Sequence, residues 1–190
     1  MNRTQLIQGI INKLNYKSYL EIGCAAGDVN FSKINIAHKV GVDPNQGGTH
    51  RMTSDDYFSK HKDKFDIIFI DGLHHWEQVD IDVQNSLKCL NENGTIVMHD
   101  CSPPTERAQE RYVDQSIWTG DCWKSLVKIR CLDGIDAIVG DFDYGCGILR
   151  VRQNGFKISV SEEDLTWDNL VKNKTQWLRL TDFHTALNWV

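Results

Sequence analysis

Residues 19–27 read YLEIGCAAG, and this stretch decides the fold that the sequence predicts. Its first four residues form a short, mostly apolar run, and its last five are small residues with glycine at both ends. A strand followed at once by a glycine turn is typical of folds in which strands and helices alternate, where backbone N–H groups of the turn can approach an anionic ligand. We therefore expect a first strand here, with a ligand-binding turn at its end.

The alternation of strands and helices continues outward from this stretch. Apolar residues at helical spacing predict an amphipathic helix over residues 6–14. Further strands are predicted at residues 40–44, 51–52, 65–70, 95–98, 136–139 and 147–151, and helices at residues 54–58 (capped by Ser54), 76–90 and 123–130. The expected fold class is α/β: a Rossmann-like, doubly wound, mostly parallel seven-stranded sheet with a C-terminal antiparallel hairpin and helices on both faces.

Length and composition indicate one globular domain. The chain has 190 residues, of which 41% are hydrophobic and 25% charged, values close to the globular average. We expect a single domain over residues 1–190, with a core at about 18–152 and a C-terminal extension at about 153–190. Residues 100–120 carry two prolines and little periodicity, which predicts a long loop of the kind that often acts as a lid.

Charge and hydropathy argue against two classes of partner. The net charge of −5 and the scattered basic residues argue against a nucleic acid, because phosphate binding needs a basic patch. No apolar run approaches the roughly 20 residues that a membrane-spanning helix needs, and the N-terminus lacks the apolar block of a secretory signal. The six cysteines show no C-x-x-C spacing, which favours reduced thiols. We therefore expect a cytoplasmic protein.

Small and acidic residues gather where the predicted strands end, which is where open parallel sheets bind ligands. Glu21 and the glycine turn belong to the first strand end, Asp43 ends the second strand, and Ser54 and Asp55 lie near the third. A carboxylate such as Asp43 can accept hydrogen bonds from both hydroxyls of a ribose. A glycine turn alone is compatible with a plain connection, but the series favours a nucleotide-like ligand. The G-x-G-x-x-G signature of dinucleotide-binding folds is absent.

A second group of polar residues follows the next two strands. Asp71 ends one strand and precedes His74 and His75, and His99 and Asp100 end the following strand. If these strands are neighbours, the groups lie about 5 Å apart and can share a hard cation such as Mg²⁺ or Mn²⁺ through Asp71, His99 and Asp100. His74 could then act as a general base, because an imidazole takes up a proton near neutral pH.

Two other interpretations of this group stay open. Asp71 could merely cap the helix that follows, with the histidines on the surface. Asp71, His74 and His75 are also compatible with Fe(II), as in a metal-dependent oxygenase or hydrolase.

The two groups of residues resemble a known family. Residues 21–27 are similar to motif I of class I S-adenosylmethionine-dependent methyltransferases, with Ala25 at the place of a common middle glycine. The Asp-Gly-x-His pattern of residues 71–74, followed by a helix and then His99 and Asp100, resembles the Methyltransf_24 group and the related metal-dependent macrolide sugar O-methyltransferases. His99 stands where those enzymes have the first acidic residue of a pair.

The resemblance implies a metal-assisted O-methyltransferase with S-adenosylmethionine as the methyl donor. The residues that it places at the donor are Glu21, Gly23, Cys24, Ala25, Gly27, Asp43, Ser54, Asp55 and Asp71. It implies that Asp71, His99 and Asp100 hold Mg²⁺ or Mn²⁺. The implied catalytic residues are Asp71, Asp100 and His74, with His74 as the base that removes the hydroxyl proton.

The expected acceptor is a sugar or glycan, because residues 120–124 and 143–147 resemble segments of glycan-modifying proteins in this group. The candidate substrate residues are His75, Trp123, Lys124 and Tyr144. Trp118, Trp123 and Tyr144 could stack on a sugar ring, although buried packing explains such aromatics equally well, and Lys124 could orient substrate or merely end a helical face. The sequence is also compatible with a homodimer, with fusion to or association with glycosyltransferases, and with a catalytically silent donor-binding module.

Overall fold

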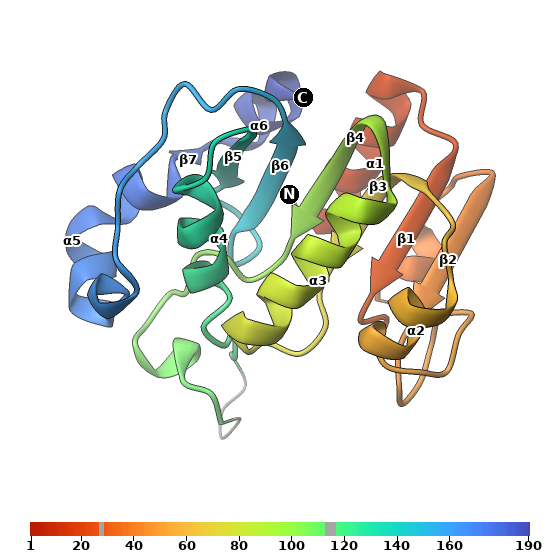
Figure 1. Ribbon diagram of the computed structural model, residues 1–190, viewed down its shortest axis with the longest axis horizontal. Coiled ribbons are helices and arrows are strands. Elements are labelled where there is room, and N and C mark those ends of the chain that lie inside the picture. The colour runs from red at the N-terminus through yellow and green to blue at the C-terminus, as the bar shows by residue number, and fades with distance from the viewer. Residues whose placement is uncertain (27–28, 113–116) are drawn as a thin grey trace.

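Seven strands form one sheet, which runs through the middle of the computed structural model (Figure 1). The structure describes residues 1–26, 29–112 and 117–190. The strands are β1 (Ser18–Ile22), β2 (His38–Val42), β3 (Phe65–Ile70), β4 (Leu90–Met98), β5 (Ile135–Gly140), β6 (Cys146–Val151) and β7 (Leu180–Thr181). Their order across the sheet is β2-β1-β3-β4-β6-β5-β7. β6 runs antiparallel to β4 and β5, and the other strand pairs are parallel, which confirms the predicted α/β class and its antiparallel hairpin.

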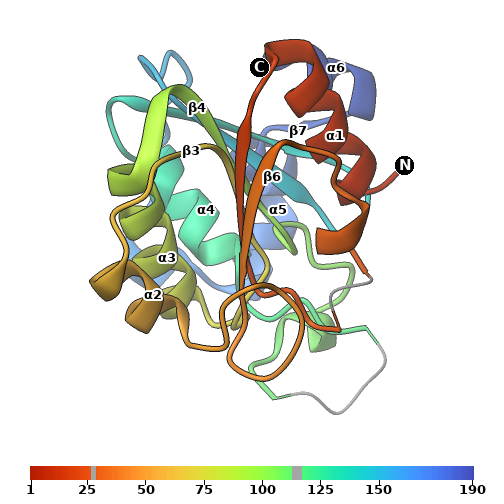
Figure 2. The same ribbon diagram turned by 90° about the vertical axis from the view of Figure 1, so that its right-hand side faces the viewer.

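Helices cover both faces of the sheet, as the sequence predicts (Figure 2). They are α1 (Arg3–Leu14), α2 (Ser54–Lys60), α3 (Trp76–Cys89), α4 (Trp123–Arg130), α5 (Trp167–Leu178) and α6 (Phe183–Trp189). One buried apolar cluster packs α1 and α6 against one face, and a second packs α2, α3, α4 and α5 against the other. Within the described ranges, no helix combines the length and the apolar character needed to cross a membrane.

The central strand β3 explains how the sheet gathers polar residues at one edge. Ile67, Ile68 and Phe69 are fully buried, as expected for a parallel strand that is covered on both faces. At the end of β3, Ile70 pairs with Ile22 of β1 and with Met98 of β4. Because these three strands end at the same level, the segments that begin at residues 23, 71 and 99 meet at one edge of the sheet.

The structure corrects the predicted third strand. Residues 51–52 belong to no strand, and the nearby pairing is an isolated bridge between Val42 and His50. The seventh strand is instead β7, near the C-terminus, whose residues Leu180 and Thr181 pair with the end of β5. A strand of two residues is too short to show alternating hydropathy, so periodicity carried no signal for it.

The start of α2 is also corrected. Thr53, and not Ser54, is the N-cap residue, because the Thr53 hydroxyl accepts a hydrogen bond from the Asp56 N–H at 3.2 Å. Ser54 is the first helical residue, which leaves its hydroxyl to other partners. The helix continues to Lys60, two residues beyond the predicted end at residue 58.

Candidate active site

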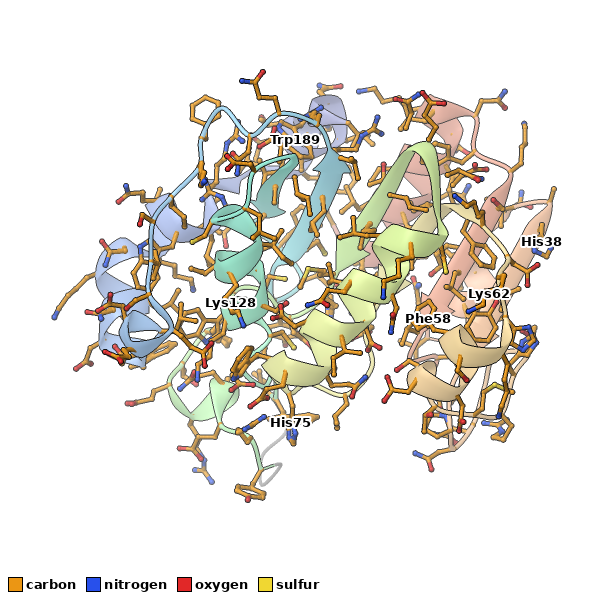
Figure 3. The ribbon with its side chains drawn as sticks, in the orientation of Figure 1. His38, Phe58, Lys62, His75, Lys128 and Trp189 are labelled. Carbon is orange, nitrogen blue, oxygen red and sulfur yellow. The ribbon has the colours of Figure 1, made fainter. Side chains whose placement is uncertain are left out.

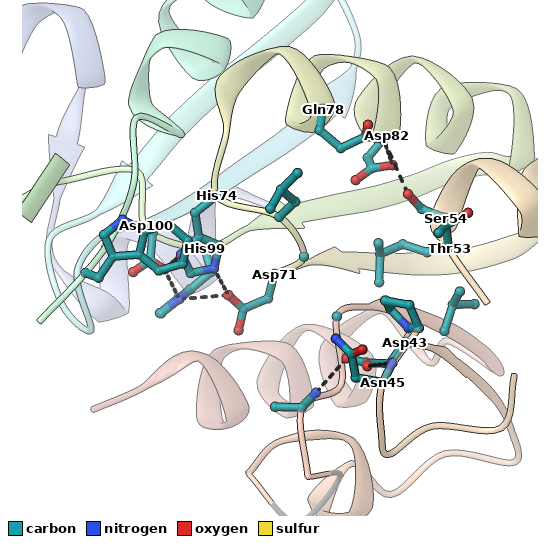
Figure 4. Close-up of a pocket in the computed structure, with 18 of the residues that line it drawn as sticks. Asp43, Asn45, Thr53, Ser54, Asp71, His74, Gln78, Asp82, His99 and Asp100 are labelled. Carbon is teal, nitrogen blue, oxygen red and sulfur yellow. Dashed lines mark hydrogen bonds and ion pairs between the residues drawn. The ribbon is translucent and has the colours of Figure 1, made fainter. Parts of the chain in front are cut away.

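A cavity of about 680 Å³ opens at the edge of the sheet where β1, β2, β3 and β4 end (Figure 4). This volume lies within the range of small-molecule binding sites, and the location is the one at which open parallel sheets bind ligands. Its walls come from the turns after these strands, from α2 and α3, from the first turn of α1 and from the loop before α4. Most of the site residues predicted from the sequence therefore line this cavity.

The turn after β1 packs tightly against the turn after β3. Gly23 has a φ of +84°, and a Cβ at this position would lie 2.0 Å from the backbone oxygen of Asp71. Only glycine allows this approach without strain. Gly23 and Ala25 line the cavity, whereas Cys24 is buried behind them. Gly27, the last residue of the predicted turn, lies outside the described residues.

Asp43, at the end of β2, is held by backbone N–H groups. Its Oδ2 accepts hydrogen bonds from Cys24 and Ala25 at 3.0 Å each. Its Oδ1 accepts hydrogen bonds from Asn45 at 2.8 Å and from Gln46 at 2.9 Å. Burial alone would raise the pKa of Asp43, but these four hydrogen bonds outweigh it and hold the pKa below its ordinary value. The turn after β1 and the carboxylate of Asp43, which were both predicted to meet the ligand, therefore bind each other.

Glu21 is 1% exposed and does not line the cavity. Its carboxylate accepts hydrogen bonds from the Tyr19 hydroxyl and from the Asn30 amide, which in turn accepts one from Thr4 of α1. Burial raises the pKa of Glu21 to about 7, although the two hydrogen bonds lower it. Glu21 thus supports the turn after β1 from inside the protein.

Glu21→Gln is expected to make the stability of the protein less sensitive to pH. Because the folded state raises the pKa of Glu21 from 4.5 to about 7, it binds the proton more tightly than the unfolded state, and stability falls as the pH rises through this window. Glutamine keeps an acceptor for Tyr19 and Asn30 but carries no charge. Between pH 5 and pH 8, the free energy of unfolding from urea titrations should fall by up to about 3 kcal/mol more in the wild type than in the variant. Parallel pH profiles for the two proteins would contradict this expectation.

Four polar side chains line the end of the cavity that α2 and α3 form. Gln78 donates hydrogen bonds from Nε2 to the side chains of Ser54, Asp55 and Asp82 at 3.2–3.4 Å. Asp82 is 1% exposed, and burial raises the pKa of its carboxyl group to about 6. The sequence predicted Ser54 and Asp55 but missed Gln78 and Asp82. Asp82 could have been predicted, because its carboxyl group stands next to Val83 in the apolar stripe of α3.

Two carboxylates and two imidazoles meet at the other end of the cavity (Figure 4). His74 Nε2 lies 3.3 Å from Asp71 Oδ1, and His74 Nδ1 lies 3.3 Å from Asp100 Oδ2. His99 Nδ1 lies 3.3 Å from Asp71 Oδ1 and 3.2 Å from Asp100 Oδ2. We call these four residues the His–Asp cluster. They come from the segments after β3 and β4, whose neighbouring positions in the sheet bring them together.

Charges within the His–Asp cluster shift one another's pKa values. Burial alone would raise the pKa of Asp71, but the charge of His99 and hydrogen bonds from both histidines outweigh it and hold that pKa well below its ordinary value. At Asp100 burial dominates and raises the pKa. Burial lowers the pKa of His74 and of His99, but the nearby carboxylates outweigh it and raise both. Asp71 is therefore ionised at neutral pH.

Arg3 and Asp143 extend the cluster, although neither was predicted from the sequence as a candidate site residue. Nη1 of Arg3 donates hydrogen bonds to both oxygens of Asp143 at 3.1 Å and lies 3.2 Å from His99 Nε2. Its Nε lies 3.6 Å from Asp71 Oδ2. Asp143, in the turn between β5 and β6, also accepts the backbone N–H of Arg3 at 2.8 Å. Nothing in the sequence linked Arg3 to residues that lie about 70 and 140 positions away.

The His–Asp cluster has the donor chemistry of a site for a hard divalent cation. Asp71, His74 and Asp100 each offer one ligand atom, and these atoms lie within 4.8 Å of one another. The cluster's nitrogen–oxygen separations of 3.2–3.3 Å are close to the edge of about 3 Å between neighbouring ligands of octahedral Mg²⁺. His74 Nδ1 is buried and, although Asp100 Oδ2 lies 3.3 Å away, it makes no hydrogen bond within the described residues. The residues present therefore fit such an ion.

The loop before α4 brings an aromatic face to this end of the cavity. Trp118 lines the cavity and stacks on His74, with ring centroids 4.6 Å apart. Gly120 has a φ of +58°, and a Cβ there would lie 1.9 Å from the backbone oxygen of His74. Tyr144, which the sequence predicted to contact substrate, lines the cavity from the turn between β5 and β6.

Trp123, another predicted substrate residue, lies in the core and not in the cavity. Its side chain is fully buried and stacks on Trp177 with centroids 6.4 Å apart. Its Nε1 donates a hydrogen bond to Gln109 at 3.0 Å. The apolar stripe of α4 carries Trp123 into the core, which is the buried packing that the sequence left open, and we remove it from the site.

Lys124 and His75 also lie outside the cavity. Lys124 follows Trp123 on α4, and its Nζ is 3.4 Å from Asp121 Oδ2. His75, labelled in Figure 3, is the N-cap residue of α3. Its Nε2 lies 3.2 Å from the backbone oxygen of Arg111. The predicted group of Asp71, His74 and His75 is therefore not assembled, because neighbouring residues at the start of a helix point in different directions.

The fold is similar to that of solved Rossmann-like methyltransferase structures. The O-methyltransferase from Bacillus cereus, in complex with S-adenosylhomocysteine, aligns over 80% of this chain and 82% of its own, with 14% identity and a TM-score of 0.55. The S-adenosylhomocysteine-bound methyltransferase PaMTH1 from Podospora anserina aligns over 80% of both chains, with 15% identity and a TM-score of 0.57. The O-methyltransferase TomG from Streptomyces achromogenes, in complex with S-adenosylmethionine, aligns over 78% of this chain and 79% of its own, with 12% identity and a TM-score of 0.52.

Part of the sequence also matches a family model. Residues 35–101 match the Methyltransf_24 family, a methyltransferase domain. The matched segment includes Asp43 and all four residues of the His–Asp cluster. No curated protein matches the chain. The match covers about a third of the chain, and the fold is similar to that of the solved methyltransferase structures.

Proposed function

We propose that this methyltransferase transfers a methyl group from S-adenosylmethionine to a hydroxyl group of a sugar or glycan, with the assistance of Mg²⁺ or Mn²⁺. The observation that carries the proposal is the His–Asp cluster at one end of the cavity. A base beside two carboxylates can remove the proton of a hydroxyl group and hold the cation that favours this step. The opposite end of the cavity has room and polar groups for an adenosyl group.

The donor would lie along the ends of β1, β2 and β3. Its adenine would lie against Ser54 and Asp55, where Gln78 and Asp82 add further polar groups. Its methionine portion would lie beside Gly23, where the turn after β1 approaches the backbone of Asp71. This orientation would direct the donor methyl group toward the His–Asp cluster.

His74 is the proposed general base. Its Nε2 lies 3.3 Å from the ionised Asp71, which fixes the orientation of the ring, and its Nδ1 lies 3.3 Å from Asp100 Oδ2 without forming a hydrogen bond within the described residues. An acceptor hydroxyl would give its proton to His74 as its oxygen attacks the methyl carbon. The bond between that carbon and the donor sulfur breaks, which leaves S-adenosylhomocysteine and the methyl ether.

Asp71, Asp100 and His99 are the residues that would hold the cation. His99 Nδ1 lies 3.3 Å from Asp71 Oδ1 and 3.2 Å from Asp100 Oδ2, and it would take the ligand position that His74 leaves when His74 acts as the base. When bound, the cation lowers the pKa of the acceptor hydroxyl and orients it. Asp71 would therefore have two functions: it would bind the cation and orient the ring of His74.

A sugar acceptor is supported by the aromatic side chains beside His74. Trp118 and Tyr144 both line the cavity, and aromatic faces provide large contact surfaces beside a polar group. Transfer of a labelled methyl group from S-adenosylmethionine to a panel of free and nucleotide-linked sugars, with and without a chelator, tests the acceptor. Methylation of amines but of no hydroxyl would overturn this part of the proposal.

Asp100→Asn is expected to weaken Mn²⁺ binding at least about tenfold, because the variant replaces an anionic ligand by a neutral amide. Calorimetric titration of the chelator-treated protein with Mn²⁺ measures the change. Asp55→Asn is the matched control, since Asp55 lines the same cavity on α2, away from the His–Asp cluster. Equal Mn²⁺ affinities for Asp100→Asn and the wild type would place the metal elsewhere or exclude its role.

A further inference from the structure

The segment of residues 120–124 contains a buried carboxylate that has no contact with the cavity. Trp123 and Lys124, the candidate substrate residues of this segment, lie outside the cavity, and so does Asp121, which is only 2% exposed. A buried carboxylate needs partners within the protein, because burial removes its hydration. The partners of Asp121 show what this segment does.

The side chain of Asp121 caps the helix that follows the His–Asp cluster segment. Its Oδ1 accepts a hydrogen bond from the N–H of Trp76, the first residue of α3, at 2.9 Å. The first N–H groups of a helix have no partner within the helix, and a carboxylate is a favourable acceptor there. His75, the N-cap residue, makes no capping hydrogen bond with its own side chain. Asp121 therefore supplies the cap of α3 from a distant part of the chain.

The backbone of Asp121 holds His74 as well. The Asp121 N–H donates a hydrogen bond to the carbonyl oxygen of His74 at 3.3 Å, and Gly120 packs closely against the same oxygen. The other carboxylate oxygen of Asp121 lies 3.4 Å from the Nζ of Lys124, which fixes the orientation of the carboxylate. Asp121 thus holds the chain on both sides of His75, at His74 and at Trp76.

We propose that Asp121 is a positioning residue for methyl transfer, which places the imidazole of His74 by holding its backbone and by capping α3. The inference rests on the proposed role of His74 as the base. Asp121 does not touch the ligands, so its effect on the reaction would pass through His74. A displacement of a reacting group by about 1 Å can cost roughly 10²-fold in rate.

Asp121→Ala is expected to lower the single-turnover rate of methyl transfer by about 10- to 100-fold. The acceptor is the sugar that gives most product in the panel described above. The KM for this sugar and the affinity for S-adenosylhomocysteine should stay within about twofold of the wild type, because Asp121 contributes no ligand contact. Asp121→Asn keeps an oxygen for the Trp76 N–H and should recover most of the rate.

Asp182→Ala is the matched control, because it also removes a helix cap. Asp182 accepts hydrogen bonds from the N–H groups of His184 and Thr185 at the start of α6 and does not line the cavity. Both alanine variants should melt about 2–4 °C below the wild type. Only Asp121→Ala should lose rate, so a loss of the same size in Asp182→Ala would reduce the effect to stability and overturn the proposal.

The double variant His74→Gln/Asp121→Ala tests whether Asp121 acts through His74. It should be as slow as His74→Gln alone, since a base that is absent cannot also be misplaced. Losses that multiply in the double variant would overturn the proposal. A raised KM for the sugar at an unchanged rate in Asp121→Ala would also overturn it and would assign Asp121 to acceptor binding.

The imidazole nitrogen signals of His74 in ¹⁵N-labelled protein give a readout that needs no acceptor. Signals that are missing from His74→Gln identify this ring. We expect them to shift in Asp121→Ala and to keep their wild-type positions in Asp182→Ala. Unchanged signals in Asp121→Ala would overturn the proposal. Shifted signals in a protein that methylates no sugar would instead refute the proposed acceptor and leave the positioning of His74 supported.

Discussion

His74→Gln is expected to lower the rate of methyl transfer by about 10²–10⁴-fold, the usual contribution of a general base. Glutamine retains hydrogen-bonding groups near Asp71 but cannot take up the proton. The affinity for S-adenosylhomocysteine should stay within about twofold of the wild type, because His74 lies at the acceptor end of the cavity. Single-turnover rates with saturating donor, together with calorimetric titration, separate the two effects.

His75→Gln is the matched control for this experiment. His75 is the next residue in the sequence, yet its side chain contacts the backbone of Arg111 and does not line the cavity. Its rate of methyl transfer should match the wild type. If His74→Gln retained the wild-type rate, His74 would not be the base. If the wild type bound donor but methylated no acceptor, a donor-binding module without catalysis would be the better description.

Trp123→Ala should destabilise the folded protein by about 3–5 kcal/mol, the cost of removing a large aromatic side chain from a packed core. The fully buried Trp123 also stacks on Trp177 and donates a hydrogen bond to Gln109, so the truncation leaves a void and an unpaired acceptor. The free energy of unfolding from urea titration measures this loss. A folded variant of near wild-type stability with a raised KM for a sugar would restore Trp123 to the substrate site.

Trp118→Ala is the companion variant because Trp118 lines the cavity. It removes the ring that stacks on His74 but opens no hole in the core. We expect a stability within about 1 kcal/mol of the wild type, as for most changes outside the core, together with weaker binding of the acceptor. A core role is thus expected to lower the free energy of unfolding, as in Trp123→Ala. A substrate role is expected to weaken acceptor binding, as in Trp118→Ala.

The sequence predicted those parts of the fold that have a periodic or compositional signal. The buried apolar run of β3 and the glycine turn after β1 were sufficient to predict a parallel sheet with a ligand site at its edge. The strand β7 has two residues and therefore no period to detect. Its pairing with β5 depends on how α5 and α6 fold back on the sheet, which only the tertiary structure determines.

The candidate site was predictable where its residues follow strands directly, as in the His–Asp cluster. Arg3 and Asp82 were missed because they come from helices, where a charged residue next to an apolar stripe usually faces solvent. Trp123 was misplaced because resemblance to a glycan-related segment does not reveal which side of a helix faces the core. The hydrogen bonds of Asp43 come from residues in two separate turns, and no spacing in the sequence shows that these turns close on one carboxylate.

The contact between Gly120 and His74 limits how the acceptor preference of this enzyme can be redesigned. A Cβ at residue 120 would collide with the backbone of His74. The position of the loop before α4 is therefore coupled to the position of the proposed base. A chimera that receives this loop from another methyltransferase would inherit a new acceptor surface and a displaced histidine together, unless the graft keeps glycine at that position. A grafted loop can therefore change the acceptor surface without moving His74 only if it keeps glycine at residue 120.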